Sequence, residues 1–203
     1  MSQSVILSAR RTPIGRFMGG LSRVASPDLG SMVVQAALEE VAGSSDRIDE
    51  CIMGCVLQAG LGQNPARQAG LKAGLSHELN AQTINKVCGS GLQSVMLADQ
   101  SIRAGDNSVV VAGGFESMSN VPYALPKARW GQRMGDGKLI DLMVGDGLTD
   151  PYGKCHMGSY AELCAKTHEI TRDDQDAHAD EPHLFVLRLI SDFGPQKWHF
   201  AFW

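Results

Sequence analysis

Short apolar runs alternate with longer segments of helical periodicity through the first half of the chain. This alternation predicts strands at residues 5–9, 48–56, 83–87 and 108–112, and helices at residues 27–41, 64–74 and 89–104. Strands that alternate with helices along a chain build layered sheets. The pattern therefore predicts a layered α/β domain.

Several of the predicted helices carry their own start and stop signals. Asn64 fits an N-cap that is followed by Pro65 at the first helical position, and Gly105 fits a helix end. A later helix is predicted at residues 158–168, and Thr171 followed by Asp174 predicts the start of another. The stripe expected on the apolar face of the first helix consists of Leu29, Met32, Val33, Ala36, Ala37 and Glu40.

The residue composition changes twice along the chain, which predicts three regions. Residues 1–118 form the α/β core, and residues 119–181 form a loop region. Gly, Pro, Met and charged residues crowd together from Glu116 to about Asp150, as is typical of a long functional loop or a small subdomain. Residues 182–203 hold half of the aromatic residues of the chain. We interpret this tail as foreign to the preceding domain, as a frameshifted or alternatively spliced end would be. An ordinary C-terminal strand at residues 184–190 is the alternative.

Composition and charge narrow the class of protein. The chain has 203 residues, 43% hydrophobic and 20% charged, which is ordinary for a soluble globular domain. It contains no apolar run of about 18 residues, the minimum for a membrane-spanning helix. The net charge of -4 gives no general attraction to nucleic acid or to anionic lipid.

The five cysteines predict free thiols and not a disulfide framework. Their number is odd and no CxxC pair occurs, which favours a reducing compartment and a cytoplasmic location. Cys51 and Cys55 lie on a predicted strand without a second ligand pair, and the adjacent Cys155 and His156 lack one as well, so no zinc site is predicted.

The N-terminal segment admits two interpretations. Residues 1–27 contain four arginines and no acidic residue, as a transit peptide would. However, the apolar run at residues 5–7 is short and is followed by small residues, and no apolar signal core is present. We therefore favour a buried strand at residues 5–9.

Cys88 stands between a predicted strand and a predicted helix, among small residues. This position would hold the sulfur at a sharp turn near the positive end of the helix dipole, where free N–H groups favour the thiolate. Gly89 and Gly91 would let a substrate or another backbone segment approach closely. In other enzymes, a strand-to-helix turn of this kind exposes the nucleophilic serine of the G-x-S-x-G motif. The pattern favours a nucleophile over a buried structural cysteine, which is the commoner role.

Five stretches in order give the chain a resemblance to the thiolases over residues 3–181. They are SARRTPIG at 8–15, GQNPARQ at 62–68, NKVCGSG at 85–91, AGGFESMS at 112–119 and CHMG at 155–158. The pair His156 and Met157 resembles the short-chain, biosynthetic branch, the acetyl-CoA C-acetyltransferases. Ketoacyl synthases also place a cysteine between strand and helix, but the second and fifth stretches weigh against that alternative.

The resemblance implies a fold, an activity and its residues. The fold would be a layered α/β domain with a mixed β-sheet and flanking helices, followed by part of the family's loop domain, which binds CoA. Two acetyl-CoA molecules would give acetoacetyl-CoA and CoA, reversibly, with Cys88 as the acylated nucleophile. His156 and Met157 would bind CoA near its pantetheine end, and the backbone at Cys88 and Gly89 would contact the oxyanion. The family uses no cofactor and no metal, only CoA thioesters as substrates. A homo-oligomer, dimer or tetramer, is expected, with the strand at 83–87 facing the partner, and no nucleic-acid or membrane partner.

The chain also departs from the family. Family chains are about twice as long, and their second half carries an Asn-Glu-Ala-Phe motif, a Gly-His-Pro histidine and a Cys-x-Gly-Gly-Gly cysteine, none of which is present here. A Claisen condensation needs an activated thiolate, a base at the α-carbon and oxyanion donors. We therefore expect this truncated chain to be inactive by itself. The alternative is a non-catalytic fragment or isoform that dimerises with a full-length thiolase.

Overall fold

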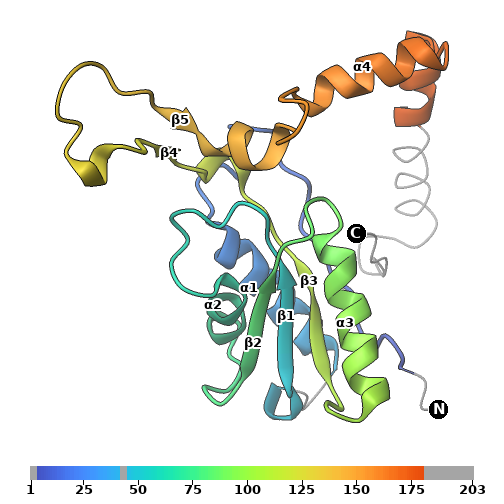
Figure 1. Ribbon diagram of the computed structural model, residues 1–203. Helices are drawn as coiled ribbons and strands as arrows, with labels where there is room; N and C mark the ends of the chain where they lie inside the picture. Colours follow the sequence, from blue (N-terminus) through green and yellow to red (C-terminus); the bar gives the residue numbers. More distant parts are fainter. Residues whose placement is uncertain (1–3, 42–44, 181–203) are drawn as a thin grey trace. The chain divides into compact units, whose positions relative to one another are not determined.

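The structure is a computed structural model that describes residues 4–41 and 45–180. It divides into two compact units, with the boundary between Gly147 and Leu148 (Figure 1). The helices and strands of the first unit are α1 (Ser26–Glu40), β1 (Glu50–Gly54), α2 (Pro65–Lys72), β2 (Asn80–Ile84), α3 (Ser90–Ala104), β3 (Val110–Gly114), β4 (Tyr123–Ala124) and β5 (Ile140–Asp141). Short 3-10 helices lie at Ser45–Arg47, Met118–Asn120 and Ala128–Trp130, and a π-helix lies at Met143–Leu148.

The first unit is built on a parallel sheet in the order β2–β1–β3. On the central strand, Cys51 pairs with Ala81 of β2 and with Val111 of β3. Helices α1 and α2 lie on one side of this sheet and α3 lies on the other (Figure 1). The predicted layered α/β arrangement is confirmed. The three strands of this sheet are all parallel, so the mixed pairing expected for the sheet is not observed in it. Among the described residues, antiparallel pairing occurs between β4 and β5 and at the isolated Thr149–His156 bridge.

The hydrophobic core fills the space between the sheet and the α1–α2 layer. Its members come from α1, β1, α2 and the loops beside them: Val34, Cys51, Met53, Cys55, Ala66, Ala69, Leu75, Leu79 and Phe115. The stripe predicted for α1 is wrong at Met32, which is 55% exposed. The helix instead presents Gly30 and Val34 to the core. A Cβ at Gly30 would lie 2.4 Å from the Phe115 ring, so the buried face centres on a glycine that a hydrophobic pattern does not register.

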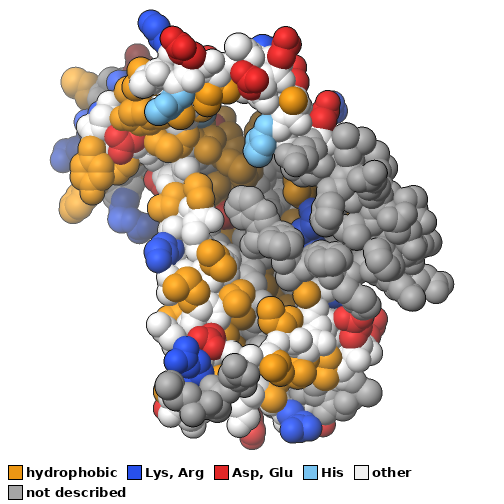
Figure 2. Space-filling view, turned by 90° about the vertical axis from the view of Figure 1, so that its right-hand side faces the viewer, with side chains coloured by type: hydrophobic (Ala, Val, Ile, Leu, Met, Phe, Trp, Pro, Cys, Tyr) orange, Lys and Arg blue, Asp and Glu red, His pale blue; other side chains and the backbone are white. Residues whose placement is uncertain are grey.

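Helix α3 packs closely on the other side of the sheet through small residues. A Cβ at Gly54 would lie 2.5 Å from the carbonyl carbon of Ser90. Further along the helix, the buried Ser94 hydroxyl donates to the carbonyl of Gly113 at 2.6 Å. The outer face of α3 exposes Leu92, Val95 and Met96. Figure 2 looks onto the side where α3 lies and shows hydrophobic side chains gathered there.

The start of α2 confirms the predicted cap. The Asn64 side-chain oxygen accepts the Arg67 N–H at 3.2 Å, and Pro65 is the first helical residue. Thr83 of β2 donates to the same Asn64 oxygen at 2.9 Å and accepts the Ala66 N–H at 2.9 Å. The helix is therefore fixed to the edge strand as well as capped.

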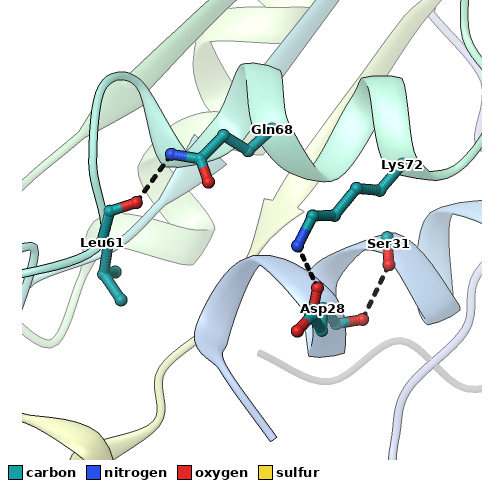
Figure 3. A network of polar contacts seen from close by, with 5 residues as sticks. All are labelled: Asp28, Ser31, Leu61, Gln68 and Lys72. Carbon is teal, nitrogen blue, oxygen red and sulfur yellow. Dashed lines mark hydrogen bonds and ion pairs between the residues drawn. The ribbon is translucent and has the colours of Figure 1, made fainter.

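Polar contacts also hold α2 to α1 and to the loop that precedes it. Gln68 donates to the Leu61 carbonyl at 2.7 Å, and Lys72 pairs with Asp28 of α1 (Figure 3). The Asp28 carbonyl in turn accepts the Ser31 hydroxyl at 2.8 Å. Gln68 thus fixes the loop between β1 and α2, and Lys72 fixes α2 to α1.

The buried strand predicted at residues 5–9 is not observed. Val5, Ile6 and Leu7 are 73%, 75% and 62% exposed, and the segment has no strand structure. Instead, side chains tie it to helices, since the Ser4 hydroxyl donates to Asp99 of α3. High β-propensity forms a strand only where a neighbouring strand offers hydrogen bonds, and none of the described strands pairs with this segment.

The second unit contains α4 (Met157–Thr167) and a helix at residues 172–180. The predicted start at Thr171 is confirmed, because its hydroxyl donates to Asp174 at 2.6 Å while the Asp174 N–H donates back at 3.2 Å. No helix among the described residues is long and apolar enough to cross a membrane. The tail at 182–203 lies outside the described residues, and the predicted boundary after residue 118 stays a prediction.

Candidate active site

Cys88 lies on an exposed turn between β2 and α3. The strand ends at Ile84, earlier than the predicted 83–87, and the helix begins at Ser90. Cys88 is exposed and stands two residues before the helix, with Gly89 as the N-cap residue. The predicted placement between a strand and a helix is confirmed, with a short turn inserted after the strand.

The backbone of this turn is strained at Val87. Its φ angle is 50°, a left-handed conformation that is a real outlier for a β-branched residue. The Val87 N–H donates to the Asn85 side-chain oxygen at 2.9 Å. The Val87 carbonyl accepts the Ser90 hydroxyl at 2.6 Å and the Ser90 N–H at 3.1 Å. Such strain persists only where the surroundings hold both ends of the residue, as they do here.

The amides around Cys88 differ in their hydrogen bonding. The Gly89 N–H donates to the Lys86 carbonyl at 3.1 Å, so the turn itself already uses this donor. The Cys88 N–H donates to no acceptor within residues 4–41 and 45–180. Of the two backbone positions predicted to contact an oxyanion, the Cys88 amide is therefore the available donor.

Two glycines that the sequence analysis did not single out bring α3 onto the ends of the strands. Besides Gly54, Gly114 leaves no room for a side chain, since a Cβ there would lie 3.0 Å from the Gly54 carbonyl oxygen and 3.3 Å from the Gly91 Cα. The sequence analysis predicted close approach at Gly89 and Gly91 only, and of these two Gly91 lies at this contact. Gly54 and Gly114 could have been identified from the sequence, because a glycine near the end of a predicted buried strand often marks a close approach of another backbone segment.

Glu116 organises the neighbouring loop that follows β1. Its half-buried carboxylate accepts the N–H groups of Val56 and Leu57 at 2.9 and 3.1 Å. The Val56 carbonyl then accepts the Asn85 amide at 3.4 Å, which links this loop to the Cys88 turn. The sequence analysis quoted Glu116 only as part of a motif, because nothing in a sequence shows which amides a carboxylate will meet.

Two further cysteines lie in the same unit and are buried. Cys51 on β1 and Cys55 just after it are 0% and 1% exposed. Burial, together with the nearby Glu50 charge, raises the pKa of the Cys51 thiol to about 12. Burial and the Glu116 carboxylate, which accepts from the sulfur at 3.5 Å, raise the pKa of the Cys55 thiol to about 12. Both stay protonated and inaccessible, unlike Cys88.

His156 and Met157 lie in the second unit, at the start of α4. The His156 Nδ1 accepts the Gly158 N–H at 3.0 Å and so caps the helix, and Met157 is 42% exposed. The preceding loop is closed by the Asp150 N–H, which donates to the Cys155 carbonyl at 2.9 Å, and by the Tyr160 hydroxyl, which donates to Asp150 at 2.9 Å. These contacts fix the backbone that carries both predicted CoA-binding residues.

Comparison with known proteins identifies the class to which this fold and turn belong. The family model described as the N-terminal domain of thiolase matches residues 4–184, which is most of the chain. The chain therefore belongs to the thiolase family.

Similar curated proteins narrow the relationship. The chain is 54% identical over 179 residues to the acetyl-CoA acetyltransferase of Cupriavidus necator, covering 88% of this chain and 46% of that protein. It is 53% identical to the acetyl-CoA acetyltransferase of Escherichia coli, covering 87% and 45%. It is 52% identical to the mitochondrial acetyl-CoA acetyltransferase A of Xenopus laevis, covering 88% and 42%. The chain thus spans about half the length of the curated relatives it matches.

Proposed function

We propose that Cys88 is the acyl-accepting nucleophile of a thiolase reaction, in which two acetyl-CoA molecules give acetoacetyl-CoA and CoA, reversibly. The observation that carries this proposal is the exposed Cys88 on a strained turn, two residues before a 15-residue helix, with an amide that has no acceptor among residues 4–41 and 45–180. Family membership and the names of the relatives support the substrate class.

The acylation step follows from this arrangement. The Cys88 thiolate attacks the thioester carbonyl carbon, a new C–S bond forms, and the carbonyl electron pair moves onto oxygen. In this proposal the Cys88 N–H donates to that oxyanion, and removal of one such donor typically costs about 10²–10³ in rate. The C–S bond to CoA then breaks, and the departing CoA thiolate takes up a proton. The proton of the Cys88 thiol is released to solvent.

The second unit is proposed to bind CoA. His156 and Met157 would contact the pantetheine end, with His156 Nδ1 occupied as a helix cap and Nε2 left for the ligand. In this proposal the protein's own sulfur carries the acyl group, so the reaction uses CoA thioesters and no other cofactor or metal. We also propose a cytoplasmic location, which the five free cysteines support.

The test is acyl transfer to the 203-residue polypeptide. Incubation with acetyl-CoA should add one acetyl group to the Cys88 peptide, detected by mass mapping, and Cys88→Ala should abolish it. Because the 203 residues lack the second-half motifs, we expect single acylation without sustained thiolysis of acetoacetyl-CoA. Acetylation at Cys155 or Cys164 in place of Cys88 would contradict the assignment.

A second candidate function is association with a full-length thiolase as a non-catalytic partner. Two observations favour it: β2 is an edge strand of the described sheet, and α3 exposes Leu92, Val95 and Met96. Exposed strand edges and apolar faces favour association with another chain. We also propose a homo-oligomer, a dimer or tetramer, through the β2 edge. Sedimentation at micromolar concentration should show a dimer or larger species, and a clean monomer would count against both.

A further inference from the structure

The Ser90 hydroxyl bridges the two residues that precede Cys88. It accepts the Lys86 N–H at 2.8 Å and donates to the Val87 carbonyl at 2.6 Å, and Ser90 is only 4% exposed. Ser90 itself follows Cys88 in the chain. The two bonds therefore close a loop around Cys88, with a single side chain serving as both acceptor and donor.

The loop is needed because Val87 does not favour its own conformation. A β-branched residue in the left-handed region relaxes unless its neighbours hold it. Asn85 holds the Val87 N–H, and Ser90 holds the Val87 carbonyl. Since Cys88 follows directly, any relaxation at Val87 rotates the peptide plane that carries the Cys88 amide.

We propose that Ser90 is a positioning residue for Cys88. Its hydroxyl fixes the left-handed turn at Val87 and thereby the backbone from which the Cys88 sulfur and amide project. This inference rests on the proposed function of Cys88 and adds a residue that acts through the backbone, without contacting substrate.

Ser94 provides a matched control on the same helix. It is also a buried serine, at 0% exposed, and its hydroxyl donates to the carbonyls of Gly91 and Gly113 at 2.6 Å each. These bonds hold α3 to β3 and do not reach the Cys88 turn. Ser94→Ala therefore removes the same group from a similar environment without touching Val87.

The experiment measures iodoacetamide labelling of all five cysteines in one sample by peptide mass mapping. Cys88 should react faster than the exposed Cys155 and Cys164, which act as internal rate standards. Ser90→Ala should lower this advantage by at least about threefold to tenfold, because it removes the hydroxyl's hydrogen bonds to both Lys86 and Val87, and Ser94→Ala should leave it unchanged. Protection of Cys51 and Cys55 reports that each variant remains folded.

A second substitution tests the mechanism. Glycine adopts the left-handed region without strain, so Val87→Gly in the Ser90→Ala background should restore part of the lost reactivity. An unchanged Cys88 rate in Ser90→Ala, or an equal loss in Ser94→Ala, would overturn the inference. If Cys51 and Cys55 become labelled in a variant, only the rescue by Val87→Gly is evaluated. Absence of that rescue would overturn the inference.

Acetyl-CoA acylation of the same variants separates the two proposals. If the iodoacetamide rates of Cys88 in the wild type and the two serine variants are as expected but wild-type Cys88 is never acetylated, the proposed function fails while the positioning role stands. If wild-type and Ser90→Ala chains are labelled and acetylated equally, the positioning role fails while the proposed function stands.

Discussion

Two adjacent parallel strands lead to cysteines with opposite surroundings. Beside the end of β1, Cys55 is buried and contacts the Glu116 carboxylate. Beyond the end of β2, Cys88 stands exposed on a strained turn. The residue type is the same, and the strands are paired neighbours. The difference shows that the chain path after each strand decides whether a thiol is available for chemistry.

The largest expected difference between the two sites is in accessibility. In the native chain, iodoacetamide should modify Cys51 and Cys55 at least about a hundredfold more slowly than Cys88, because the buried thiols react only after the structure opens. Adding urea above the unfolding midpoint should remove the difference. Rapid labelling of Cys55 in the absence of urea would show that the two regions do not differ.

Removal of the Glu116 carboxylate should weaken the buried site. Glu116→Ala leaves the amides of Val56 and Leu57 without their charged acceptor and should lower the free energy of unfolding by about 2–4 kcal/mol. Urea denaturation measures the loss. Glu162→Gln on the exposed surface of α4 is the control, with an expected change within about 0.5 kcal/mol. Equal stability of the two variants would show that Glu116 does not hold the β1 loop.

Besides the hydrogen bond between Val56 and Asn85, the close approach of Gly54 to α3 joins the two regions. Gly54→Ala would force a Cβ to within 2.6 Å of the Gly91 nitrogen, so we expect a loss of about 1–3 kcal/mol from overpacking. A fall in Cys88 labelling should accompany it, because the helix start must shift. Gly20→Ala, where a Cβ meets nothing within 4 Å, is the matched control for the glycine-to-alanine change.

The last effect concerns alkaline pH and is absent at neutral pH, where both buried thiols stay protonated in the folded and the unfolded state. Burial raises the pKa of the Cys51 and Cys55 thiols from 9.0 to about 12, so the folded state holds these protons more tightly than the unfolded state. Their contribution to stability is complete below pH 9 and is lost as the pH rises toward 12, by up to about 1.4 kcal/mol per pH unit for each thiol.

Unfolding measured between pH 8 and 10 should therefore become easier as the pH rises. The decline should be less steep in Cys55→Ala, whereas Cys164→Ala, which removes an exposed thiol, should leave the slope unchanged. A stability that rises over this interval would contradict the assigned protonation states.

Much of the fold could be predicted from local signals. The Asn64 cap, the Gly105 helix end and the Thr171–Asp174 capping pair are each satisfied within a few residues, and each is confirmed. The strand predicted at residues 5–9 failed because a strand depends on a partner that its own sequence does not contain. For the same reason, the buried face of α1 was misplaced at Met32, since Phe115 contacts the helix from a distant part of the chain.

The sequence by itself determined the order of strands and helices, the position of Cys88 before a helix, and membership of the thiolase family. These follow from periodicity, from short-range capping and from contiguous motifs. Only the tertiary structure decided that Val87 is strained, that Ser90 and Asn85 hold it, and that Glu116 organises the neighbouring loop. The physical reason is that hydrogen-bond partners and backbone angles in the Cys88 turn depend on how α3 packs against the ends of β1 and β3. That packing requires glycine at positions 54 and 114, which becomes evident only in the folded structure.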